Sequence, residues 1–131
     1  MRLRLPQRRE RQPDVAGLEP FEQAVVRFNA SEAGHAVAGL VRTLGAPSVS
    51  VGASAGAADE VRITVAWELS WYQWGVDLGD ESRPVFELGK GGQVGELDFA
   101  ARQWNASALE EGRVVLAPPR PRRPGGRAAR R

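Results

Sequence analysis

The side chains that most often catalyse reactions or bind transition metals are scarce in this chain. It has no cysteine and a single histidine, His35, which excludes a thiolate nucleophile and a cysteine–histidine metal site. No serine lies in the Gly-x-Ser-x-Gly motif that exposes a hydrolase nucleophile. We therefore expect no enzymatic activity, no metal and no cofactor, and we interpret His35 as an ordinary surface residue.

Two short segments have the composition of ligand-binding loops but not the spacing. Asp77, Asp80 and Glu81 lack the alternating ligands that a calcium loop places over about 12 residues, so they indicate a solvent-exposed turn. Gly89-Lys90-Gly91-Gly92 lacks the leading glycine and the closing serine or threonine of a phosphate-binding loop. We interpret this segment as a flexible connector, and anion binding by its backbone amides as the alternative.

Charge is divided between an acidic middle and two arginine-rich ends. Residues 15–118 contain 14 acidic and 7 basic side chains, although the whole chain has a net charge of +2. Such basic ends attract polyanions such as nucleic acids. The candidate polyanion contacts are Arg2, Arg4, Arg8, Arg9, Arg11, Arg120, Arg122, Arg123, Arg127, Arg130 and Arg131.

Composition also predicts how the chain is organised. Residues 1–18 are polar and residues 119–131 are rich in proline and arginine, so both are expected to be disordered arms. A single domain should occupy 19–118. No apolar run approaches the ~20 residues of a membrane span, and none follows the basic first residues as in a signal peptide. We expect a cytoplasmic protein with no membrane contact.

The first half of the domain should begin with one or two helices. Phe21, Val25 and Phe28 have helical spacing, but alternation toward Phe28 also fits a short strand. The pattern over 31–44 is a clearer helix, with Ser31 as its cap and Gly45 as its stop. A helix followed by a short turn also suggests a helix-turn-helix, but the alternation over 48–52 favours a strand there.

The best-patterned segment covers residues 61–78. Odd-numbered residues from Val61 to Trp71 are mostly apolar, and after Ser70 the apolar residues are even-numbered, from Tyr72 to Leu78. One strand of this length is too long for the domain. We therefore predict a bulge or bend near 70–73, because one extra residue exchanges the two faces of a strand.

The second half should complete the sheet and add a helix. Residues 79–82 predict a turn, 85–88 the returning strand of a hairpin, 96–108 a helix and 113–117 a last strand. The predicted fold class is α+β: an antiparallel sheet of three to four strands with helices packed on one face.

The aromatic residues Trp71, Tyr72 and Trp74 are the most unusual concentration of side chains. Trp71 continues the predicted buried stripe, whereas Tyr72 and Trp74 should face the opposite way. An exposed aromatic patch is typical of an interface. The leading hypothesis is a non-enzymatic interaction domain that binds a protein partner, or itself as a homodimer, through this hairpin. The alternatives are a nucleic-acid accessory protein that uses its basic arms and a small-ligand-binding domain.

Overall fold

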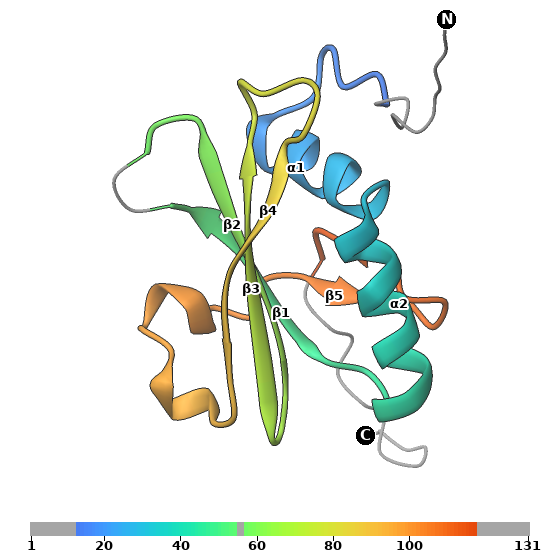
Figure 1. Cartoon of the computed structure of the whole chain (residues 1–131), viewed down its shortest axis with the longest axis vertical. Helices are drawn as coiled ribbons and strands as arrows, with labels where there is room; N and C mark the ends of the chain where they lie inside the picture. Colours follow the sequence, from blue (N-terminus) through green and yellow to red (C-terminus); the bar gives the residue numbers. More distant parts are fainter. Residues whose placement is uncertain (1–12, 55–56, 118–131) are drawn as a thin grey trace, which may run out of the picture.

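Two helices and a four-stranded antiparallel sheet make up most of the fold, which confirms the predicted α+β class (Figure 1). The computed structural model of the 131-residue chain describes residues 13–54 and 57–117, so residues 1–12 of the first predicted arm and all of the second (119–131) lie outside the described residues. Within the large sheet the strand order is β1-β2-β3-β4. The elements are α1 (Pro20–Asn29), α2 (Glu32–Leu44), β1 (Ser48–Ala53), β2 (Glu60–Trp67), β3 (Ser70–Asp77), β4 (Val85–Gly91), the 3-10 turns η2 (Val94–Glu96) and η3 (Ala100–Arg102), and a small two-stranded sheet of β5 (Ser107–Ala108) and β6 (Val114–Val115).

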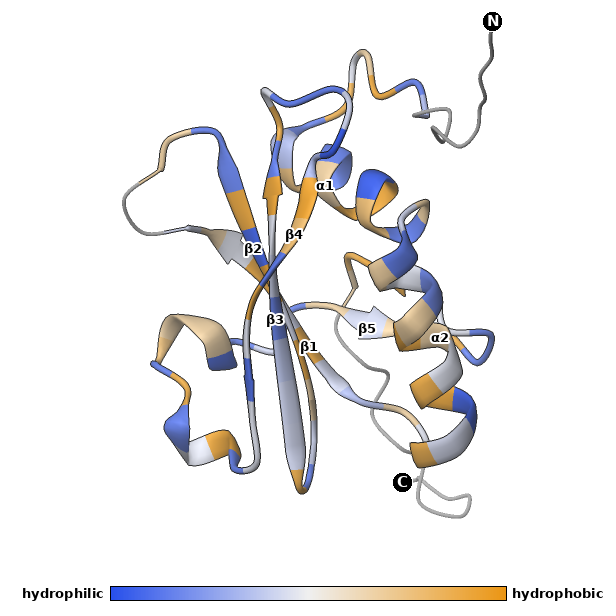
Figure 2. Cartoon of the chain, in the orientation of Figure 1, coloured by the Kyte–Doolittle hydropathy of each residue, from blue (hydrophilic) through white to orange (hydrophobic). Residues whose placement is uncertain are grey.

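The two helices follow from local signals in the sequence. Pro20 occupies the first turn of α1, and Glu19 forms a capping box with Glu22. Of the two predictions for 21–29, the helix is therefore the correct one. The prediction for 31–44 is confirmed: the Ser31 side chain accepts a hydrogen bond from the Gly34 amide, and Gly45 ends α2 with a positive φ of 92°. In Figure 2 both helices alternate between hydrophobic and hydrophilic residues, as expected of helices with one buried side.

Residues 61–78 form two strands joined by the turn Glu68-Leu69, so the predicted bulge within one long strand is wrong. The pairing sets Trp67 opposite Ser70 and Val65 opposite Tyr72. In such a hairpin the odd-numbered residues of β2 share a face with the even-numbered residues of β3. A two-residue turn thus produces the same exchange of faces as a bulge, and the turn carries none of the glycine, asparagine or proline residues that usually mark one.

The core lies between the helices and one face of the sheet. Its largest fully buried side chains include Phe28 of α1, Val37 of α2 and Ile63 of β2. Phe28 contacts the ring of Trp74, with 5.1 Å between ring centroids. Figure 1 shows α1 and α2 on the same side of the sheet, as predicted for the helices. Burial of apolar side chains against this face is therefore what holds the helices to the sheet.

The helix predicted over 96–108 is absent. Two 3-10 turns, extended chain and β5 occupy this segment. The 3-10 turns lie on the side of the large sheet opposite the helices, whereas β5 lies beside α2 (Figure 1). Leu97 and Ala101 are buried as their spacing suggested, but Trp104 has a φ of 50°, which no α-helix tolerates. The last strand is confirmed only as the short β6. Gly89 and Gly91 belong to β4 and not to a connector.

Candidate interaction surface

The three aromatic residues predicted to bind a partner do not form one surface. Trp74 is only 8% exposed and packs against Phe28, so it is a core residue. Tyr72 is half-buried on the same face, stacked on Trp74 with ring centroids 5.9 Å apart and in edge contact with Trp67. Trp71 lies on the opposite face, because it pairs with Ala66. Trp71 therefore faces away from the core, whereas Tyr72 and Trp74 face toward it, which is the reverse of the prediction.

Trp71 lies across two glycines of β4. Its indole N–H donates a hydrogen bond of 2.9 Å to the Glu96 carboxylate, and this bond is the main reason that the pKa of Glu96 is lowered. A Cβ on Gly91 would lie 2.6 Å from the indole ring, while one on Gly89 would be in ordinary contact with it. The glycines that suggested a phosphate loop thus leave room for a tryptophan.

The face that carries Trp71 is rich in hydrogen bonds made by side chains. Gln73 donates to the Thr64 hydroxyl at 3.1 Å, and the Trp104 amide donates to the Ser50 hydroxyl at 2.7 Å. Asn105 bonds both the N–H and the C=O of Val51, each at 2.9 Å. These bonds fasten residues 104 and 105 to β1 and close one side of the sheet.

Arg62 and Asp98 add an ion pair to the same face. The two terminal nitrogens of the Arg62 guanidinium donate to the Asp98 carboxylate, at 3.2 and 3.0 Å. These bonds, and a further one from the Ala101 amide, lower the pKa of Asp98. The ion pair ties η3 to the middle of the sheet, while the Asp98 side chain stays largely exposed.

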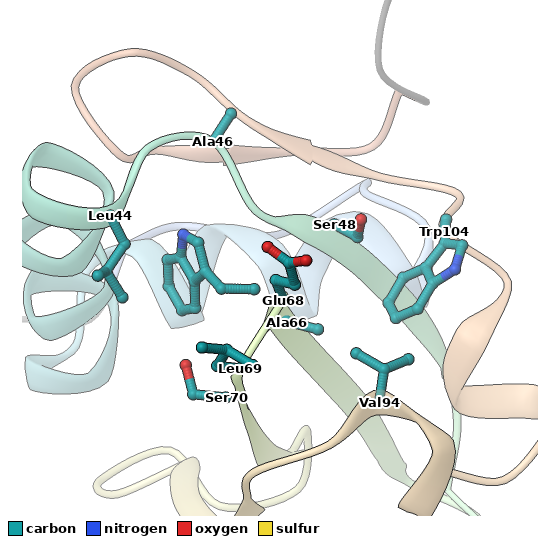
Figure 3. Close-up of a pocket in the computed structure, with 10 residues that line it drawn as sticks. Leu44, Ala46, Ser48, Ala66, Glu68, Leu69, Ser70, Val94 and Trp104 are labelled. Carbon is teal, nitrogen blue, oxygen red and sulfur yellow. The ribbon is translucent and has the colours of Figure 1, made fainter.

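A depression of about 550 Å³ lies at the end of the β2–β3 hairpin, and we call it the hairpin notch (Figure 3). Its walls come from the end of α2, the start of β1, the hairpin turn, η2 and the segment before β5. Trp67 helps to shape it, because its indole N–H donates to the Gly45 carbonyl at 2.8 Å and so ties the α2–β1 loop to the hairpin. The lining residues are Leu44, Ala46, Ser48, Ala66, Trp67, Glu68, Leu69, Ser70, Val94 and Trp104.

The hairpin notch combines exposed apolar side chains with one acidic group. Leu69 is 80% exposed in the turn and Leu44 is 50% exposed at the end of α2. Figure 3 shows Glu68 and Leu69 on one side of the notch and Val94 and Trp104 on the other. Of the described residues that line the notch, Glu68 alone is charged. Apolar walls with a single charged group are typical of a binding site.

The remaining candidates behave as ordinary surface groups. His35 is exposed on α2, as predicted. The Asp80 carboxylate accepts hydrogen bonds from the Arg83 and Ser82 amides of its own turn, and these bonds lower its pKa. Within residues 13–54 and 57–117, no three histidine or acidic side chains lie close enough to hold a metal ion. Nor is any helix in that part of the chain long and apolar enough to cross a membrane.

All eleven arginines predicted to contact polyanions lie outside the described residues. The structure therefore adds no geometry to that prediction. Comparisons of the chain with protein-family models, with curated protein sequences and with solved structures find no match.

Proposed function

We propose that this chain is a non-enzymatic interaction domain that docks a partner protein in the hairpin notch. The occupant would be an extended segment with an apolar side chain next to a lysine or arginine. The volume and apolar lining of the notch support this proposal. The site differs from the aromatic cluster predicted from the sequence, since Trp74 is part of the core and only Trp71 and Tyr72 keep exposed surface near the hairpin.

The strained backbone conformation of Trp104 is the main support for this proposal. A φ of 50° in a bulky residue costs about 1–3 kcal/mol and persists only where neighbouring contacts impose it. Here Ser50 and the two hydrogen bonds of Asn105 impose it. The result of this strained backbone is an indole held at the wall of an open depression, where it is only half-buried. Strained residues of this kind cluster at ligand-binding sites.

Charge then selects the kind of partner. Glu68 is exposed in the hairpin turn, and among residues 13–54 and 57–117 no basic side chain lines the notch. An acidic group without a cation beside it favours a basic residue in the partner segment. Complementary charge of this type improves specificity and the rate of association more than it improves affinity. Apolar contact with Leu69, Val94 and Trp104 would supply most of the binding energy.

Selection of peptides on the full-length chain tests this proposal. Random peptides displayed on phage should converge on an apolar residue adjacent to lysine or arginine. Binding of the selected peptides should fall about tenfold or more in Leu69→Ser and Val94→Ser, which shorten the apolar walls. Glu68→Gln should weaken only those peptides that carry the basic residue.

The matched control is Phe99→Ser, because Phe99 is 78% exposed but does not line the notch. It should leave peptide affinity unchanged. Peptides that bind equally well to wild type and to the Leu69→Ser and Val94→Ser variants would contradict the proposal, as would a selection with no common sequence.

Nucleic-acid binding by the arginine-rich ends remains a second candidate, supported by six arginines and no acidic residue in 119–131. The acidic excess of residues 15–118 would repel the same phosphates, so binding should be weak and should fall steeply with salt. Fluorescence anisotropy of labelled DNA with the full chain and with residues 15–118 separates the two functions.

We also propose a cytoplasmic location, in keeping with a chain that has no cysteine.

A further inference from the structure

β4 is the outer edge of the large sheet. The strand order places it next to β3 alone, and within residues 13–54 and 57–117 no other strand or isolated bridge pairs with it. Its side chains are mostly exposed, including Phe86, Glu87 and Leu88. An unpaired edge presents a row of backbone donors and acceptors to which another strand can bond.

The direction of those backbone groups follows from the ladder. The Asp77 amide donates to the Pro84 carbonyl at 2.7 Å, so Asp77 directs its backbone groups toward β4. In an antiparallel ladder this direction alternates along each strand. Trp74 and Tyr72 therefore direct their backbone groups away from β4, and their partners Glu87 and Lys90 direct theirs to the open edge.

A bulge gives this edge an unusual spacing. Trp74 pairs with Glu87 and Gln73 pairs with Gly89, which leaves Leu88 as the extra residue. Outward-directed residues are two apart in a regular strand, whereas Glu87 and Lys90 are three apart. A strand without a bulge that paired with this edge would be out of register with it beyond Leu88. A second β4 running antiparallel has the same three-residue spacing and stays in register on both sides.

We propose that two copies of this chain pair edge to edge through β4, with Glu87 of one copy opposite Lys90 of the other. Both side chains lie on the same face, because their partners Trp74 and Tyr72 do. Two-fold symmetry then forms the Glu87–Lys90 pair twice. On the other face Phe86 would meet Gly91 of the second copy, which has no side chain to obstruct it, and the Phe86 ring is already turned inward over Gly75.

This pairing uses the sheet edge and does not depend on the hairpin notch. A single pair of strands buries less surface than the about 1,200 Å² of standard interfaces, so the dimer should be weak, with a Kd on the order of 10–100 µM. Sedimentation of the full chain at increasing concentration should show a monomer–dimer equilibrium in that range.

Charge reversal tests the register. Glu87→Lys alone places lysine opposite lysine, and Lys90→Glu alone places glutamate opposite glutamate, so each variant should dimerise about tenfold more weakly or worse. An equimolar mixture of the two variants restores opposite charges at both positions and should dimerise about as well as wild type. Glu110→Lys makes the same charge change far from β4, in the turn between β5 and β6, and should have no effect.

Amide hydrogen exchange tests the backbone pairing itself. In the wild-type dimer, amide hydrogen exchange of Glu87 and Lys90 should slow as protein concentration rises. A chain that stays monomeric at every concentration overturns the pairing. So does a dimer that both charge variants leave unchanged, or a mixture of the variants that fails to dimerise. Peptide binding to the notch is measured separately, so none of these outcomes decides the proposed function.

Discussion

The two faces of the large sheet are held by different interactions. On one face, two helices bury apolar side chains such as Phe28, Val37 and Ile63. On the other, a segment with only 3-10 turns is fastened by the Trp104 hydrogen bond to Ser50, by the two bonds between Asn105 and Val51 and by the Arg62–Asp98 ion pair. The first face depends on burial, which is distributed over many contacts. The second depends on a few directional bonds, each of which can be removed singly.

This difference explains where the candidate site lies. The hairpin notch is bounded by the end of α2 from the helix face and by Val94 and Trp104 from the opposite segment. Hydrogen bonds can hold a backbone such as that of Trp104 in a strained conformation, because each bond fixes the direction of a donor and an acceptor. Apolar packing does not fix direction in this way. The face with fewer apolar contacts is therefore the one that can present side chains to a partner.

The largest expected effect comes from the helix face. Phe28→Ala removes a fully buried ring that contacts Trp74, and should lower the free energy of unfolding by about 3–5 kcal/mol. Urea denaturation followed by tryptophan fluorescence measures it. Phe21→Ala is the matched control on the same helix, since Phe21 is exposed. Equal losses for the two variants would mean that the core is not where we place it.

A smaller effect is expected from the opposite face. Asn105→Ala leaves the N–H and C=O of the buried Val51 without their partners, at a cost of about 1–3 kcal/mol in the free energy of unfolding. The same variant should release Trp104 and weaken peptide binding to the notch. Gln103→Ala, which removes an exposed hydrogen bond to Phe99, should change stability little. An unaffected Asn105→Ala variant would show that hydrogen bonds do not hold this segment.

Gly91→Ala probes how tightly Trp71 covers β4. The added methyl overlaps both the indole and the Glu96 carboxylate, so one of them must move, at a cost of about 1–2 kcal/mol. The indole N–H resonance of Trp71 should shift as its bond to Glu96 is disturbed. Gly92→Ala has room for the methyl and serves as the control. No shift of that resonance would contradict the described packing.

The smallest effect should be that of the Arg62–Asp98 ion pair. The pKa of Asp98 is lowered in the folded chain, so its contribution to stability is present above the ordinary carboxyl pKa and is lost as pH falls through the lowered value. Because Asp98 is largely exposed, the contribution should be below about 1 kcal/mol. Asp98→Asn should remove it at neutral pH and flatten stability between about pH 5 and pH 2. An unchanged pH profile would contradict this role.

The two faces also differ in how far the sequence predicts them. Ser31 and Gly45 mark both ends of α2, because caps are local signals. The alternation in β2 and β3 identifies the strands but not their connection, since a two-residue turn and a bulge exchange the faces alike. The alternation therefore places Leu69 in the buried stripe, although it lies exposed in the turn.

On the opposite face the periodic pattern of apolar residues predicts the wrong structure. Leu97 and Ala101 have helical spacing and are buried, yet no helix forms. The bonds that decide the conformation join Ser50 to Trp104 and Asn105 to Val51, each 54 residues apart in the chain. A local pattern carries no information about such distant partners. The hairpin notch depends on these contacts and on the exposed turn, which is why the sequence pointed instead to Trp71, Tyr72 and Trp74.

The four tryptophan indole N–H resonances provide the most direct test of the docking site. The measurement is a 1H–15N NMR titration of the full chain with a peptide selected for binding. We expect the Trp104 and Trp67 resonances to shift, because both residues line the notch, and the resonance of the core residue Trp74 to stay in place. Shifts at Trp71 and Trp74 with Trp104 unmoved would contradict the account and place the partner on the aromatic hairpin.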